Sequence, residues 1–116
     1  MSHAARTYAK WVRDIGAAGY STHLFYFWLN SGDLAVSRVA MRVSTGGHHI
    51  PEATIRQRYG RSLQNLFTLY MPVITTWKVY DNSAADYRLV AEGGQGFAPF
   101  VYDDKTWDQI RQGAQP

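Results

Sequence analysis

Two short runs of apolar and aromatic residues constrain the fold of this chain most. The first is STHLFYFWLN at 21–30, and the second is TTWKVYDNS at 75–83. The first run has no alternating polar face, which is typical of a strand buried on both sides of a sheet. More than forty residues separate the two runs, and a connection of that length suits a crossover between parallel strands. The sequence therefore predicts an α/β fold.

Helical periodicity fills the segments before and between these two strands. The expected helices are Ala4–Ala18, Asp33–Val43, and a longer one with Pro51 in its first turn that runs to about Tyr70. Ser31 or Asp33 can cap the second of them. Gly46 and Gly47 then break that helix, either as a hinge or as a left-handed helix cap.

The end of the chain predicts a small hairpin and a last helix. YRLVAEGG and GFAPFVYDD are short strand-like runs around three glycines, and KTWDQIR follows as a helix. Two parallel strands by themselves make a poor sheet, because parallel sheets need both faces covered and sheets below ~3 strands are rarely stable. We therefore expect that part of the fold lies outside this chain.

Length and composition favour one domain spanning residues 1–116. Hydrophobic residues make up 46% of the chain, which is enough for a packed interior and unlike a disordered chain. The longest apolar run, Leu24–Leu29, falls far short of the ~20 residues of a membrane-spanning helix. The N-terminus has no secretory signal pattern, and the chain has no cysteine. A cytoplasmic protein is the default expectation.

Arginine dominates the basic residues, and its placement suggests phosphate binding. Nine of the twelve basic residues are arginine, whose planar guanidinium fits two phosphate oxygens at once. Arg42 precedes the paired glycines, and the next expected helix contributes Arg56, Arg58 and Arg61. Helical geometry allows Arg42, Arg56 and Arg58 to converge on one anion while Arg61 faces water. The alternative is that these arginines form a solvent-exposed helix face, on which Glu52 would form an ion pair with Arg56, four residues later.

Other polar residues offer weaker candidates. His48 and His49 are adjacent, which is not the spacing of two metal ligands on a helix, so we expect no metal site there. His48 is a turn residue that could lie near a substrate. Asp81, Asn82 and Ser83 follow the second strand, where ligand groups often collect in α/β sheets, although Asx turns use the same residues locally.

The stretch RVAMRVSTGGHHIPEATIRQRYGRSLQNL, followed by WKVYDNS, resembles the carboxyl-terminal half of the zeta-toxin-like P-loop kinase family. The resemblance extends from about Tyr8 to Trp107. It implies a P-loop kinase-like fold and an enzyme that uses ATP and Mg²⁺ to phosphorylate a small acceptor. In the zeta toxins proper that acceptor is a nucleotide sugar. It also implies a lid-like helical pair, Asp33 to Tyr70.

The same resemblance assigns residues to the lid. Arg42, Arg56 and Arg58 match the motif arginines, which implies contact with the nucleotide's phosphates during transfer. His48 and Asn82 are the further candidates for nucleotide binding. In the complete enzyme the bound groups would be ATP and Mg²⁺, and we expect neither to bind tightly to this chain alone.

The chain departs from the family at the P-loop. The motif G-x-x-x-x-G-K-[ST] is absent, since none of the three lysines, Lys10, Lys78 and Lys105, follows a glycine. We therefore expect half of a kinase that is inactive alone and that associates with a missing P-loop half or with itself. The alternative is a non-catalytic interaction module that oligomerises or binds a partner through an exposed sheet edge. Nothing in the sequence favours nucleic acid as a partner.

Overall fold

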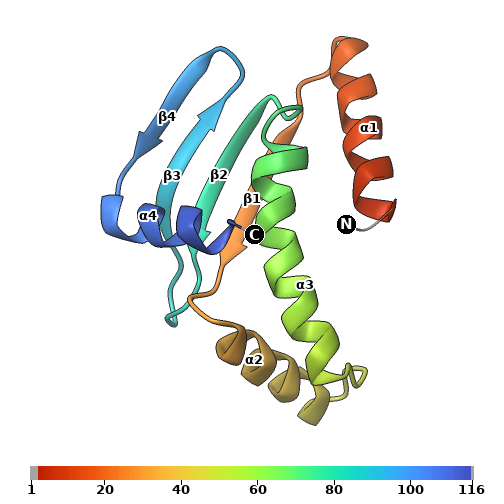
Figure 1. Ribbon diagram of the computed structural model, residues 1–116, viewed down its shortest axis with the longest axis vertical. Helices are drawn as coiled ribbons and strands as arrows, with labels where there is room; N and C mark the ends of the chain where they lie inside the picture. Colours follow the sequence, from red (N-terminus) through yellow and green to blue (C-terminus); the bar gives the residue numbers. More distant parts are fainter. Residues whose placement is uncertain (1–2, 116) are drawn as a thin grey trace.

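Four strands form one mixed sheet in the order β1-β2-β3-β4 in the computed structural model, which describes residues 3–115 (Figure 1). The strands are β1 (His23–Trp28), β2 (Thr76–Asp81), β3 (Arg88–Gly94) and β4 (Phe97–Val101). β1 and β2 run parallel, with the helices α2 (Gly32–Ser44) and α3 (Glu52–Asn65) in the crossover between them. The α/β class and the parallel pair are confirmed.

The predicted hairpin is present, and it belongs to the main sheet. β3 pairs antiparallel with β2, and β4 pairs antiparallel with β3. The turn from β2 to β3 is too short for the crossover that a parallel pair requires, so β3 has to run back along β2. The expectation of a sheet with only two strands is therefore wrong.

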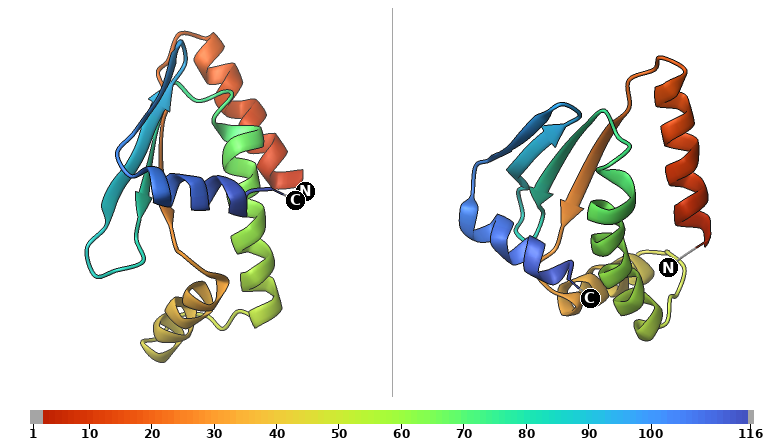
Figure 2. Two further views of the ribbon diagram at one scale, coloured as in Figure 1. Left: turned by 60° about the vertical axis from the view of Figure 1, so that its left-hand side comes forward. Right: turned by 45° about the horizontal axis from the view of Figure 1, so that its top comes forward.

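The helices α1 (His3–Ala17), α3 and α4 (Asp104–Gly113) all lie on one face of this sheet, and α2 projects beyond its end (Figure 2). Within residues 3–115, no helix covers the other face. The expectation that β1 is buried on both sides is wrong: Phe25 and Phe27 are 55% and 46% exposed, whereas Trp28 is buried. The run is apolar on both faces, but only one of them meets a helical layer. None of the described helices is long and apolar enough to cross a membrane.

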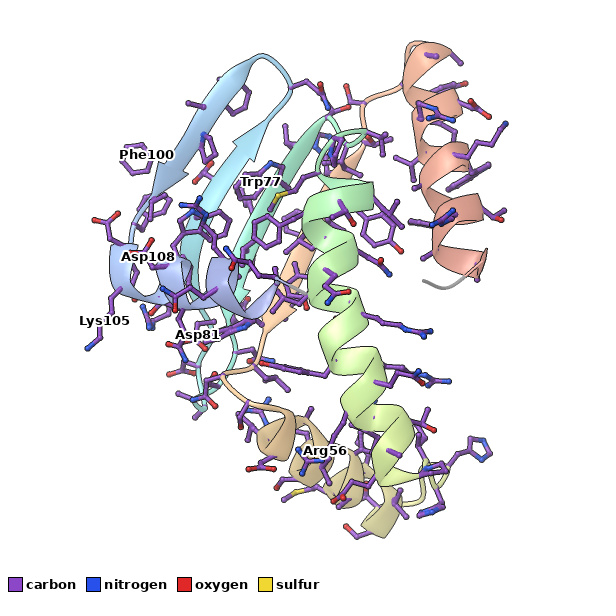
Figure 3. All side chains as sticks on the ribbon, in the orientation of Figure 1. Arg56, Trp77, Asp81, Phe100, Lys105 and Asp108 are labelled. Atoms are coloured by element: carbon purple, nitrogen blue, oxygen red, sulfur yellow. The ribbon has the colours of Figure 1, made fainter. Side chains whose placement is uncertain are left out.

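The core lies between the sheet and the three covering helices. Trp77 of β2 stacks on Trp107 of α4, with ring centroids 5.6 Å apart and planes tilted by 11° (Figure 3). Gly93 of β3 lies directly against the Trp77 ring, at the position where a side chain would otherwise stand. The buried aliphatic residues around this pair are Val12, Leu63, Leu66, Ile74, Val79, Val90 and Ile110.

The long crossover helix ends close to the predicted position, although its last turn is wider. α3 continues into a single π-turn, η1 (Leu66–Tyr70), in which the Met71 amide donates to the Leu66 carbonyl at 2.9 Å. Pro51 is the N-cap residue and does not belong to the first turn. On η1, Tyr70 makes an edge-to-face contact with Tyr8 of α1, with ring centroids 5.9 Å apart. Together with the burial of Val12 in the core, this contact attaches the first helix to the rest of the domain.

Candidate functional site

The paired glycines form a helix cap next to Arg42. Gly46 has a positive φ of 107°, its amide donates to the Val43 carbonyl at 3.1 Å, and the Gly47 amide donates to the Arg42 carbonyl at 2.8 Å. This is a Schellman motif, which selects glycine because other residues are strained at positive φ. At the other end, the Ser31 hydroxyl accepts from the Leu34 amide at 3.1 Å. Of the two interpretations of the glycine pair, the structure shows the cap.

The carboxyl ends of the parallel strands are tied together at the same edge of the sheet. The Asn82 amide donates to the Trp28 carbonyl at 2.7 Å, and the Asn30 amide donates to the Ser83 hydroxyl at 2.9 Å. The Ser83 amide in turn donates to a carboxylate oxygen of Asp81 at 3.0 Å, which is an Asx turn. The local structural role of this segment is therefore confirmed.

A cavity of about 520 Å³ lies where these strand ends face α2. It is lined by Phe27, Leu29, Ser37, Arg38, Met41, Arg42 and Asn82. In open α/β sheets, ligands bind outside the carboxyl ends of parallel strands, so this is the expected place for a site. We call it the strand-end cavity.

Two arginines give the strand-end cavity its positive charge. Arg38 is fixed by its neighbours, because its guanidinium donates to the carbonyls of Asn82 at 2.7 Å and Ser83 at 3.3 Å. Arg42 lies four residues further along α2, is exposed, and has no ion pair with any acidic side chain among residues 3–115. The guanidinium of Arg42 is therefore available to an anion in the cavity.

The three predicted arginines do not meet in one place. Arg56 forms an ion pair with Asp33 at 2.6 Å, and Glu52 lies 3.8 Å from it on the same helix (Figure 3). The hydrogen bond to Asp33 raises the pKa of Arg56. The charge of Arg56 is thus shared with two carboxylates at the α2–α3 junction.

Arg58 and His48 also lie outside the strand-end cavity. Arg58 lines a neighbouring hollow of about 280 Å³ along α3, which shares Phe27 and Leu29 with the strand-end cavity. His48 is exposed in the turn after α2. Of the predicted residues, the structure therefore brings Arg42 and Asn82 together, places Arg58 on the adjoining side of the β1 end, and separates Arg56 and His48 from them.

Sequence reasoning missed the residues that complete the cavity. Arg38 was not among the candidates, yet its guanidinium holds the strand-end loop, which is the segment at Asn82 and Ser83. Its spacing of four from Arg42 was the available signal, since such residues share a helix face. Phe27 and Met41 supply apolar wall, and their role depends on how β1 and α2 meet in space.

The described residues contain no ready-made cluster of metal-ligand side chains. Residues 3–115 contain no group of three His, Cys, Asp or Glu side chains arranged around a common point. Asp81 is the carboxylate at the strand ends, and its two oxygens already accept from the Ser83 amide and from Arg88 at 3.2 Å.

Comparisons of the chain with models of known families, with curated proteins and with solved structures give no match. The strand-end cavity and the resemblance of the arginine-rich segment are therefore the two grounds for a functional proposal.

Proposed function

We propose that the strand-end cavity binds the phosphates of a nucleotide, and that this chain is the lid-bearing half of a zeta-toxin-like P-loop kinase. Such an enzyme transfers a phosphoryl group from ATP to a small acceptor, such as a nucleotide sugar. The observation that carries the proposal is that Arg42, which has no ion pair among residues 3–115, lines a cavity at the carboxyl ends of two parallel strands. The resemblance of the segment around Gly46 to the family's lid supports it.

Each residue of the cavity has a distinct part in this proposal. Arg42 would donate two parallel hydrogen bonds to phosphate oxygens, the geometry for which guanidinium is suited. Arg38 positions the loop by holding the Asn82 and Ser83 carbonyls. Phe27 and Met41 would form the apolar wall beside the ligand. No residue of α2 is buried, which suits a helix that closes over a bound molecule.

Catalysis in this proposal requires a second polypeptide segment. Phosphoryl transfer depends on positioning and on stabilising the charge of the transferred group, and a P-loop does both. The 116-residue sequence contains no P-loop motif, and its described residues contain no group of three metal-ligand side chains. We therefore assign phosphate contacts to this chain and assign the P-loop and metal ligands to the missing half.

Titration with ATP tests the binding part of the proposal. We expect weak binding, roughly millimolar, seen as NMR shift changes in the amides of the strand-end loop and α2. Arg42→Gln should weaken that binding about tenfold or more, because a charge-assisted hydrogen bond contributes about 1.5–3 kcal/mol. Arg61→Gln removes the same charge from an exposed position outside the cavity and is the matched control. Equal effects of the two substitutions would contradict a specific site at Arg42.

A separate measurement tests the half-enzyme part. The isolated 116 residues should show no magnesium-dependent ATP hydrolysis or phosphoryl transfer above background. Steady turnover by this chain alone would contradict the assignment of the P-loop to another segment, whereas it would leave phosphate binding at Arg42 intact. The gene sequence upstream of Met1 gives a further test, because an in-frame G-x-x-x-x-G-K-[ST] motif is expected there.

The second candidate function is a non-catalytic interaction module that pairs through the edge of β1. The observation that favours it is that β1 pairs only with β2 in the described sheet, which leaves one row of its backbone groups free. In that case, β1 amides that point away from β2 should become protected from hydrogen exchange as protein concentration rises. Persistent fast exchange of these amides at high concentration would rule out edge pairing.

A further inference from the structure

The sheet face that carries no helix is rich in exposed aromatic side chains. We call it the open face. Its outer strands bear Phe25 and Phe27 on β1 and Phe97 and Phe100 on β4, which are 46% to 62% exposed. Phe100 projects outward from β4 (Figure 3). Four exposed aromatic side chains on one sheet face exceed the single, scattered apolar residues of an ordinary surface, and such a face is typical of an interaction site.

The strand register makes one row of this face symmetric. Phe25 pairs with Lys78, Lys78 pairs with Glu92, and Glu92 pairs with Phe100. One row across all four strands therefore reads aromatic, cation, anion, aromatic. The hydroxyl of Tyr102 donates to the Glu92 carboxylate, which fixes the anion at its place in the row.

We propose that a second copy of this chain packs on the open face, related by a twofold axis that runs parallel to the strands between β2 and β3. Rotation about that axis places β1 over β4 of the other copy and β2 over its β3. Lys78 then faces Glu92 of the second copy, and Phe25 faces Phe100. Because the axis exchanges the two protomers, every contact occurs twice.

The size and the chemistry of the open face suit a reversible dimer. Four strands about 4.8 Å apart and about 20 Å long present a face of roughly 400 Å² in projection, or about 800 Å² for the two copies together. This area is below the ~1,000 Å² of stable specific interfaces and belongs to weak, transient contacts. Two twisted sheets pack face to face with strands nearly aligned, as this axis requires. Packing would also cover the second face of the parallel pair, as parallel strands normally require.

The charge pattern favours a second copy over single-stranded nucleic acid. Aromatic platforms that bind single strands combine stacking side chains with a positively charged groove. Here the row carries one cation, Lys78, with Glu92 directly beside it, and a carboxylate at the centre of the face repels phosphate. A face with adjacent opposite charges is instead complementary to its own rotated copy. This inference does not depend on the proposed kinase function, since no residue of the row lines the strand-end cavity, although Phe27 of the open face also lines it.

Charge reversal provides the test, with dimerisation measured by analytical ultracentrifugation over about a hundredfold range of concentration. The wild type should pass from monomer to dimer. Lys78→Glu and Glu92→Lys should each weaken the dimer at least about tenfold, because each change places like charges opposite one another. The double variant, and an equimolar mixture of the two single variants, should each recover dimerisation to within a few-fold of the wild type.

Two further variants separate the interface from the fold. Lys105→Glu makes the same charge change as Lys78→Glu at an exposed position on α4, and it should leave the dimer unchanged (Figure 3). Phe100→Ser should weaken the dimer while its circular dichroism spectrum stays that of the wild type, since the Phe100 side chain is 62% exposed.

Three results would overturn this proposal. A wild type that stays monomeric throughout the range excludes the dimer. If neither charge reversal changes the dimerisation affinity, the dimer forms through another surface, such as the edge of β1. If the monomer binds poly(U) and Phe100→Ser abolishes that binding, the open face is a nucleic-acid site.

Discussion

Replacement of Gly93 by alanine should destabilise the core more than the size of one methyl group suggests. A β-carbon at this position would lie 2.5 Å from Cζ2 and 2.8 Å from Cε2 of Trp77, whereas carbon atoms in contact are normally about 3.5–4.0 Å apart. The ring or the strand must therefore move by about 1 Å. Trp77 cannot retreat easily, because its indole stacks on Trp107.

The expected loss follows from the cost of overfilling a packed core. Such changes usually cost about 1–3 kcal/mol, and we expect about 2 kcal/mol for Gly93→Ala, a fall in Tm of roughly 10 °C for a domain of this size. Urea and thermal unfolding followed by far-UV circular dichroism measure both quantities. Gly60→Ala is the control, because no atom outside its own helix and chain neighbours lies within 4 Å of the new methyl. That substitution should stabilise α3 by about 1 kcal/mol.

A double-mutant cycle tests the cause. In a Trp77→Phe background the indole atoms that meet the methyl are missing, so the penalty of Gly93→Ala should fall below about 1 kcal/mol. Two results would contradict a clash with the indole: a free energy of unfolding for Gly93→Ala within about 0.5 kcal/mol of the wild type, or an equal cost of this substitution in the Trp77→Phe background.

The other predictions concern an ion pair, a helix cap and a partly buried hydroxyl. Hydrogen bonds from Arg88, and then from Thr106, lower the pKa of Asp103 to about 2. Since this pKa lies below the unfolded value of about 3.9, the carboxylate stabilises the fold above pH ~4 and this contribution is lost between pH ~4 and ~2. Asp103→Asn should flatten that part of the acid-unfolding profile, and an unchanged slope would contradict the assignment. Gly46→Ala should cost about 1 kcal/mol in urea unfolding, because φ at this position is 107°; a neutral effect would argue against the Schellman cap. Tyr59→Phe should cost about 1 kcal/mol, since the Tyr59 hydroxyl donates to the Leu29 carbonyl at 2.6 Å; a loss below about 0.3 kcal/mol would mean that this bond adds little.

Local sequence patterns were sufficient for the order and type of most elements. The glycine pair at 46–47 ended α2 as predicted, because a positive φ and a capping hydrogen bond are requirements of the chain itself. The length between the two principal strands indicated a parallel crossover, and the glycines at 93–96 indicated the hairpin. These features depend on neighbours that are close in sequence, or on a connection length that the sequence states directly.

The candidate site was predictable only in part. Arg42 and Asn82 were both candidates, and they line one cavity. Arg56 was also a candidate, yet it is paired with Asp33 across the α2–α3 junction. A helical wheel gives the side of a helix on which an arginine lies, but its long side chain can reach several partners, and the tertiary neighbours decide among them.

By itself, therefore, the sequence determined an α/β chain with a parallel strand pair, a capped crossover helix and a surplus of arginine. The tertiary structure alone decided that β3 and β4 extend the sheet and that the helices cover one face of it. The physical reason is that an apolar run shows that a strand is suited to burial. Which of its faces is covered depends on helices that come from distant parts of the chain. Phe25 and Trp28 belong to the same apolar run, but they lie on opposite faces of the sheet. Phe25 is therefore exposed, whereas Trp28 is buried.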